Sequence, residues 1–208
     1  MIEVSINIFD LGRQRAQVLA TLTPLELIET ILQEFHEELP YLSGFPNDYE
    51  LRVANGDAGL DDRLPLNRQI SNRASLVLAE RAVELPRGGR QMTRAAYLRE
   101  QSRGSVYRLR WQPAIIGRPG SNLADNDLLA VNLAPYRNGD YVSRRQARIT
   151  EEDGQFCIEN LSPSNSVTIM DEKGNRTLID LGRHRLNSGD VIRIDASDIH
   201  LLFLKRVV

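Results

Sequence analysis

The chain of 208 residues has little of several residue types, and each shortage excludes a class of protein. It holds a single cysteine, Cys157, so no disulfide can form within the chain, and a reducing compartment is expected. No apolar run approaches the ~18 residues of a membrane-spanning helix. No basic segment precedes an apolar one near Met1, as it would in a secretory signal. We therefore expect a cytoplasmic protein without membrane insertion.

Residues that carry catalytic or metal chemistry are also scarce. The three histidines, His36, His184 and His200, stand alone, and no Cys or His lies at zinc-ligand spacing. No serine or cysteine lies in a recognisable nucleophile motif, and no glycine-rich stretch has the lysine of a phosphate loop. The sequence therefore predicts a protein that is not an enzyme and has no metal or cofactor.

Charge is unevenly distributed along the chain. Residues 1–82 carry 7 Arg and 13 Asp or Glu, a net charge of −6, whereas residues 83–103 carry 5 Arg and 2 Glu. Residues 104–208 have 14 Arg or Lys and 13 Asp or Glu. No part is basic enough to predict a nucleic-acid surface.

Residues 1–82 alternate between the periods of strands and of a helix. Apolar residues alternate with polar ones over 2–8, and a second strand follows a short connection, as in a hairpin. Thr23 and Glu26 have the spacing of a capping box, with Pro24 at the first helical position. Two further strands follow, in "YELRVAN" and "ASLVLAER". The order strand, strand, helix, strand, strand predicts an α+β domain with one helix packed on a sheet.

Residues 83–103 interrupt this pattern with Pro86, Gly88 and Gly89. We predict a linker whose segment "QMTRAAYLREQ" can form a short helix. "LPRGG", ending at Gly89, resembles the tail of ubiquitin, so processing there to release a protein modifier is one hypothesis. Thr93 would be a phosphorylation site if this linker is flexible.

Residues 104–208 contain only short runs with the pattern of strands. The runs are separated by Gly, Pro, Asn, Asp and Ser, and the segments are "VYRLRW", "AIIGR", "QARIT", "QFCIENL", "VTIM", "RTLI", "DVIRI" and "IHLLFLK". Many short strands with turn signals between them predict an all-β sandwich.

Five motifs in order give this half a family resemblance. They are "IIGR" at 115–118, the polar stretch "SNLADNDLLAVNLAPY" at 121–136, "VSRRQARI" at 142–149, "FCIENLSPSNSV" at 156–167 and, together as the fifth, the closing strands "LNSGDVIRI" at 186–194 and "LLFLKR" at 201–206. In this order they resemble the forkhead-associated (FHA) domain, a β-sandwich that binds phosphothreonine peptides. The resemblance implies a phosphopeptide-binding module that acts with a Ser/Thr protein kinase or its substrate.

The same resemblance implies a set of binding residues. Arg118 and Ser143 match the phosphate-binding arginine and serine of the family. Arg144 matches a further phosphate or peptide contact, and Asn165, preceded by Ser164, matches the asparagine that binds the peptide backbone. On an extended chain Arg144 and its neighbour Arg145 would point to opposite sides, so we expect only Arg144 at the ligand.

The sequence departs from the FHA pattern at two positions. Gln146 replaces a histidine that braces the loop from within, and glutamine keeps both a donor and an acceptor for that role. Ser166 replaces a glycine, and a serine at positive φ would cost about 1 kcal/mol. These departures leave an alternative open, in which the sandwich is a scaffold or oligomerisation domain that does not bind phosphate.

Residues 1–82 resemble ubiquitin-like domains by element order, and in particular the small ubiquitin-like proteins of bacterial type VII secretion systems. This resemblance implies a β-grasp fold and a second protein-docking module. The whole chain is then expected to be a bacterial signalling adaptor with domains at 1–82 and 104–208 joined by the linker at 83–103.

Overall fold

A computed structural model describes residues 1–122, 126–180 and 182–206. The chain divides into two compact units, Met1–Val83 and Glu84–Val208, and each is described by itself. No helix in the described part of the chain is long and apolar enough to cross a membrane.

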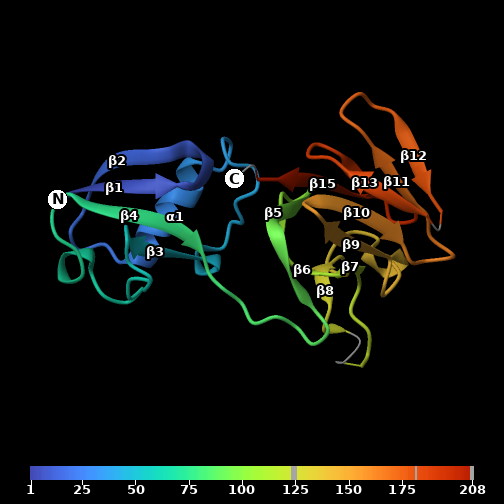
Figure 1. The fold of residues 1–208 in the computed structure, drawn as a ribbon, viewed down its shortest axis with the longest axis horizontal. Coiled ribbons are helices and arrows are strands. Elements are labelled where there is room, and N and C mark those ends of the chain that lie inside the picture. The colour runs from blue at the N-terminus through green and yellow to red at the C-terminus, as the bar shows by residue number, and fades with distance from the viewer. Residues whose placement is uncertain (123–125, 181, 207–208) are drawn as a thin grey trace. The chain divides into compact units, whose positions relative to one another are not determined.

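The first unit is a four-stranded sheet with one helix on it (Figure 1). Its elements are β1 (Ile2–Ile8), β2 (Gly12–Val18), α1 (Pro24–Glu34), β3 (Tyr49–Val53) and β4 (Ala74–Glu80). The order across the sheet is β2-β1-β4-β3, with β1 and β4 parallel and the outer pairs antiparallel. The predicted order of strands and helix in residues 1–82 is confirmed.

Helix α1 begins at the predicted capping box. Thr23 Oγ1 accepts the backbone N–H of Glu26, and the Glu26 carboxylate accepts the backbone N–H of Thr23. The carboxylate also accepts the Thr23 hydroxyl at 3.0 Å, and the two hydrogen bonds that it accepts from Thr23, the backbone one foremost, lower the pKa of the Glu26 carboxyl below its usual range. The apolar stripe of α1 is buried against inward-facing strand residues, and the core includes Leu27, Ile28, Ile31, Leu32, Val4, Ile6, Ile8, Leu51, Leu76 and Leu78.

The second unit is the predicted all-β sandwich. One sheet has the order β13-β10-β9-β7-β8 and the other β12-β11-β14-β15-β5-β6. The strands are β5 (Arg90–Glu100), β6 (Val106–Gln112), β7 (Ala114–Gly117), β8 (Leu129–Asn132), β9 (Ala147–Glu152), β10 (Gln155–Asn160), β11 (Val167–Met170), β12 (Arg176–Ile179), β13 (Arg183–Leu186), β14 (Val191–Ile194) and β15 (Ile199–Lys205). Both sheets contribute to one buried core that includes Leu98, Ile116, Ile149, Phe156 and Phe203.

The short helix predicted in the linker is wrong, because its residues form strand β5. This strand lies between β15 and β6, so both of its backbone edges have hydrogen-bonding partners. Ala96, Tyr97 and Leu98 are buried in succession. A helix of eleven residues on the surface would leave these side chains in water, and short helices are marginal without tertiary contacts. Strand pairing and burial therefore override the local helical pattern.

Thr93 lies in this strand and not in a flexible linker. Its backbone N–H donates to Glu151 Oε2 at 2.6 Å, and its hydroxyl donates to the other oxygen of the same buried carboxylate. A phosphate on Thr93 would lie against that carboxylate and repel it.

The position of β5 gives a test of where the second unit begins. A fragment of residues 84–208 should unfold in one cooperative thermal transition, whereas a fragment of residues 104–208 should not fold. Without β5, strands β15 and β6 lose their shared partner, and about 1.5–3 kcal/mol of burial is lost for Leu98 alone. Circular dichroism during heating would compare them. A cooperative transition of the shorter fragment at the same temperature would contradict this assignment.

Candidate functional site

Three loops meet at one end of the five-stranded sheet. Ala147 at the start of β9 pairs with Ile116 near the end of β7 and with Asn160 at the end of β10. The segments that continue from these three points therefore lie side by side. They carry all five binding residues that the sequence predicts: Arg118, Ser143, Arg144, Ser164 and Asn165.

The side chain of Arg118 is held by one edge of its guanidinium. Its Nε donates to the carbonyl oxygen of Val142 at 2.7 Å, and its backbone N–H donates to the carbonyl oxygen of Ser143 at 3.3 Å. Its two terminal nitrogens have no hydrogen-bond partner among the described residues. The guanidinium is thus fixed beside the Ser143 loop with donors left for an acceptor outside the chain.

Gly117 allows the segment that carries Arg118 to lie close to the Ser143 loop. A Cβ atom at Gly117 would be 2.2 Å from the carbonyl oxygen of Arg144 and 2.8 Å from that of Ser143. Real Cβ atoms are not found at such distances from backbone atoms, so only glycine fits without a shift of the loop. The glycine of the "IIGR" motif is therefore required by the close approach of two backbones.

Three serine hydroxyl groups from two of the loops are connected by hydrogen bonds, one to the next. Ser143 Oγ lies 2.8 Å from Ser162 Oγ, which lies 3.4 Å from Ser164 Oγ. Ser162 is buried, and its Oγ also accepts the backbone N–H of Asn165 at 3.2 Å. If Ser162 donates to Ser143, the hydrogen of the Ser143 hydroxyl is left for a ligand.

Asn165 joins the two loops through its side-chain amide. Its Nδ2 donates to the carbonyl oxygen of Tyr141 at 2.8 Å and to Ser143 Oγ at 3.2 Å. Its Oδ1 has no hydrogen-bond partner in the described segments. The amide is therefore oriented by its donors, while its acceptor is available to a peptide N–H.

Gln146 braces both loops from within, as the sequence predicted. Its side chain is fully buried, and Oε1 accepts the backbone N–H of Ser143 at 3.2 Å. Its Nε2 donates to the carbonyl oxygen of Asn165 at 2.9 Å and to Asn160 Oδ1 at 3.1 Å. Asn160 adds a second bond to the Asn165 carbonyl and one to the carbonyl of Asp180. One glutamine side chain thus makes three hydrogen bonds and links both site loops.

Ser166 does not take the positive φ at which a serine would be penalised. Ser166 is not among the non-glycine residues with positive φ, so no strain arises at this serine. Its hydroxyl donates to Asp195 Oδ2 at 2.7 Å, and Thr168 donates to the same oxygen at 3.0 Å. The carboxylate of Asp195 therefore anchors the serine in ordinary backbone geometry.

Arg144 and Arg145 do not alternate on an extended strand, because β9 begins only at Ala147. Both lie in a turn and both are exposed. Neither has a hydrogen bond or ion pair among the described residues. The expectation that only Arg144 faces the ligand rested on an extended backbone, and the turn removes that basis.

The sequence analysis missed Ser162 and Asn160. Neither touches the surface, yet Ser162 is the central hydroxyl and Asn160 supports the Asn165 carbonyl. A polar side chain at the buried end of β10 was a signal for Asn160, because a buried amide must find hydrogen-bonding partners.

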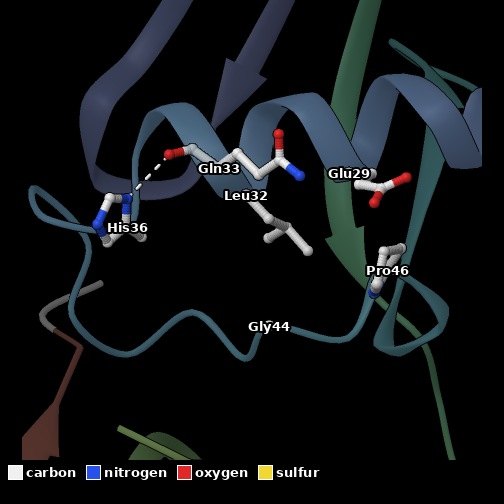
Figure 2. Close-up of a pocket in the computed structure, with 6 residues that line it drawn as sticks. All are labelled: Glu29, Leu32, Gln33, His36, Gly44 and Pro46. Atoms are coloured by element: carbon white, nitrogen blue, oxygen red, sulfur yellow. Dashed lines mark hydrogen bonds between the residues drawn. The ribbon is translucent and has the colours of Figure 1, made fainter.

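The first unit has a cavity that is not lined by any of the predicted site residues. A cavity of about 320 Å³ lies beside α1 in the first unit, lined by Glu29, Leu32, Gln33, His36, Gly44 and Pro46 (Figure 2). His36 there contacts the carbonyl oxygen of Gln33 at 2.9 Å. Within the described residues, no group of three or more His, Cys, Asp or Glu is arranged to hold a metal ion. The cavity does not include any of the predicted binding residues.

The bracing hydrogen bonds of Gln146 should contribute to the stability of the second unit. Replacing Gln146 with Ala should lower the free energy of unfolding of the second unit by about 1–3 kcal/mol, because the Ser143 N–H loses its acceptor in a buried setting. Urea unfolding would measure this. Gln101→Ala, in an exposed turn of the same unit, is the control and should change stability little. Equal effects of the two variants would contradict the bracing role.

A protein-family model matches part of the chain. Residues 114–195 match the family model described as FHA domain. No curated protein matches the chain. It is similar to the structure of EmbR of Mycobacterium tuberculosis in complex with a low-affinity phosphopeptide, at 27% identity and a TM-score of 0.41, over 57% of this chain and 27% of EmbR.

Two further structures are similar to this chain. One is the FHA domain of FhaA in complex with the intracellular domain of a second protein, at 23% identity and a TM-score of 0.38, covering 52% of this chain and 98% of that one. The other is the FHA domain of human APLF in complex with a bisphosphopeptide, at 23% identity and a TM-score of 0.38, covering 53% and 97%. The family model supports an FHA domain at residues 114–195, within the range 104–208 that the sequence predicted for it.

Proposed function

We propose that the second unit binds a phosphothreonine-containing segment of a partner protein at the three-loop site. The observation that carries this proposal is the convergence of the Arg118 guanidinium, the Ser143 hydroxyl and the Asn165 amide. All three are held by hydrogen bonds to neighbouring loops. The two terminal nitrogens of Arg118 and Asn165 Oδ1 are left for a ligand, and so is the Ser143 hydrogen when Ser162 donates to Ser143.

The charge and hydrogen-bonding capacity of this site suit a phosphate group. A phosphothreonine carries close to two negative charges and three acceptor oxygens. The free edge of the Arg118 guanidinium can donate two charge-assisted hydrogen bonds, and arginine stays ionised at any working pH. The segment 141–146 adds the exposed Arg144 and Arg145 and contains no Asp or Glu. Ser143 and Ser164 supply neutral donors.

Asn165 would bind the peptide backbone beside the phosphate. Its Nδ2 is already used to hold the Tyr141 and Ser143 loop, so the amide cannot rotate freely. The free Oδ1 is an acceptor for a backbone N–H of the bound segment. Fixing this acceptor before binding reduces the ordering cost of association.

The first unit would be a second protein-docking module. A helix packed on a sheet of order β2-β1-β4-β3 supports the proposal of a ubiquitin-like β-grasp fold. The chain would then be a non-enzymatic, cytoplasmic adaptor in bacterial Ser/Thr kinase signalling. Its sandwich would bind the kinase or a phosphorylated substrate, and its first unit would dock to a second partner, such as a component of a type VII secretion system.

The scaffold alternative rested on Gln146 and Ser166. Gln146 makes three bonds that hold the site loops, and Ser166 has no positive φ. Neither residue therefore favours a sandwich that has lost its phosphate site, and phosphothreonine binding remains our proposal.

Arg118 gives the central test. We expect the whole chain to bind a phosphothreonine peptide measurably tighter than the same peptide with threonine, by isothermal titration calorimetry. Arg118→Ala should weaken binding of the phosphorylated peptide by about 5- to 150-fold, because a charge-assisted contact to the dianion is worth about 1–3 kcal/mol.

Arg185→Ala is a matched control for this experiment. Arg185 is an exposed arginine of the edge strand β13, so its replacement removes the same charge away from the site. It should leave the affinity within about twofold. If phosphorylated and plain peptides bind equally well, or if both variants lose the same affinity, the proposed function is wrong.

The affinity for the phosphorylated peptide should change with pH because the phosphate is titrated, and not because a group of the protein is. The second phosphate pKa is about 6, so the dianion becomes a monoanion as pH falls, while Arg118 remains charged. Affinity should therefore be highest above pH 7 and fall between pH 7 and pH 5. Titrations at several pH values would check this. An affinity that rises as pH falls would point to another binding group.

A further inference from the structure

The sheet of the first unit has one face covered by α1 and one face that α1 does not cover. Residues alternate between these faces along each strand. Val4 and Ile6 are buried on the helix side, so Glu3, Ser5 and Asn7 belong to the other face. We call this other side the open face.

A basic groove of about 330 Å³ lies on the open face. The polar residues that line it are Glu3, Ser5, Arg13, Arg15, Arg73 and Ser75. Ser5 pairs with Arg15 on β2 and with Ser75 on β4, so three adjacent strands form its floor. Three of the seven arginines of residues 1–82 are gathered here, in a unit whose net charge is −6.

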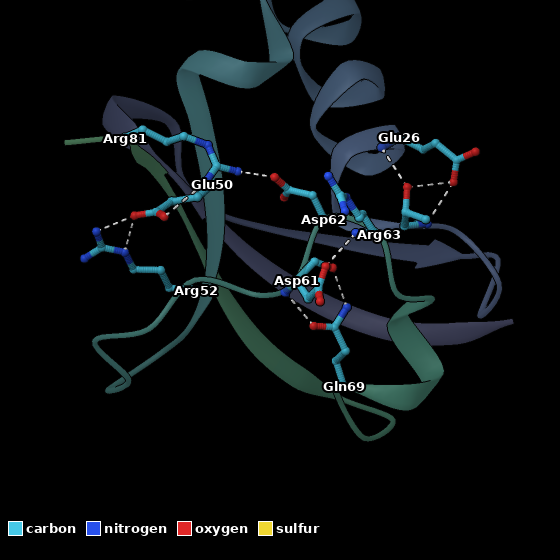
Figure 3. A network of polar contacts seen from close by, with 9 residues as sticks. Glu26, Glu50, Arg52, Asp61, Asp62, Arg63, Gln69 and Arg81 are labelled. Carbon is cyan, nitrogen blue, oxygen red and sulfur yellow. Dashed lines mark hydrogen bonds and ion pairs between the residues drawn. The ribbon is translucent and has the colours of Figure 1, made fainter. Parts of the chain in front are cut away.

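In the described part of the chain, two arginines of the groove lack the ion pairs that Arg52 and Arg81 of the same unit make. Arg81 is ion-paired with Asp62 and Glu50, and Arg52 with Glu50 (Figure 3). In the groove, only Arg73 has a recorded partner, Glu3 at 3.1 Å. Arg13 and Arg15 are exposed, with no ion pair among the described residues. The groove therefore has a surplus of positive charge.

A buried hydroxyl adds a second, independent observation. Ser5 Oγ is buried and has no hydrogen-bond partner among the described residues. A buried polar atom without a partner is costly. A carboxylate brought into the groove would pair with Arg15, which lies opposite Ser5 on the neighbouring strand.

The opposite side of the same unit is acidic. Residues 16–51 contain no Lys or Arg but seven Asp or Glu. Glu29, Glu34, Glu37 and Glu38, on α1 and just after it, are exposed. Acidic residues at the C-terminal end of a helix are unfavourable with the helix dipole, and no basic residue offsets them in the last turn. We call these four glutamates the acidic face.

We propose that the basic groove binds the acidic face of a second copy of this chain. The two complementary surfaces lie on opposite sides of one unit, so each copy would offer one to each neighbour in a head-to-tail contact, which can extend beyond a dimer. The full chain has a net charge of only −2, and at physiological salt the screening length is about 8 Å. Contacts across the interface therefore outweigh repulsion between whole molecules.

Charge-reversal variants of the full-length chain test this contact. Sedimentation velocity of the unchanged protein, from about 10 to about 500 μM, should show a mass that rises with concentration. R13E/R15E removes the groove and E34R/E38R removes the acidic face, and each should remain a monomer. Mixed in equal amounts, the two variants should associate again, with a mass that rises with concentration. The intact acidic face of one meets the intact groove of the other, and the two reversed surfaces are also opposite in charge.

Two control variants separate the contact from net charge. R63E/R68E makes the same charge change as the groove variant, and D57R/E84R the same change as the acidic-face variant, at exposed positions outside both surfaces. Both should associate as the unchanged protein does, and thermal unfolding should show that all four variants are folded. Three results would overturn the proposal: an unchanged protein that stays monomeric throughout, mixed variants that do not associate, or control variants that lose association equally.

Discussion

The buried side chain of Gln146 holds together the two loops on which the candidate site depends. Its acceptor fixes the Ser143 N–H, and its donors reach the carbonyl of Asn165 and the amide of Asn160. Inside a protein such bonds are strong, and a missing partner is expensive, so the three groups can hardly move separately. The position of Ser143 relative to Asn165 is thus set by a residue that no ligand would touch.

The same end of the sandwich depends on close contact between backbones. Gly117 lets the strand that carries Arg118 pass against the Ser143 loop, and Arg118 in turn binds the carbonyl of Val142. The side chains of Arg118 and Asn165 are therefore held in place by some of their polar atoms, and their remaining polar atoms are left for a ligand. This arrangement suits recognition of a fixed group such as phosphate, because little ordering remains to be done on binding.

Local patterns predicted much of the fold, and their failures share one cause. The capping box of α1 and the alternation of β1 depend on neighbours in sequence, so they could be read directly. Strand β5 could not, because its segment has local helical character and becomes a strand only through pairing with β15 and β6. Strand β8 lies in a polar stretch and pairs in parallel with β7, a partner that no local pattern indicates.

The sequence by itself determined which chemical groups are available: the arginine after Gly117, the serine and arginines before β9, and the asparagine after β10. The order of the motifs also predicted an FHA domain, which the family model supports at residues 114–195. Only the tertiary structure decided how these groups are held. It buried Gln146 between the loops, placed Ser162 at the centre of the hydroxyls and gave Ser166 an ordinary backbone conformation. Hydrogen bonds between residues far apart in sequence depend on strand pairing, and strand pairing is settled only when the whole sandwich forms.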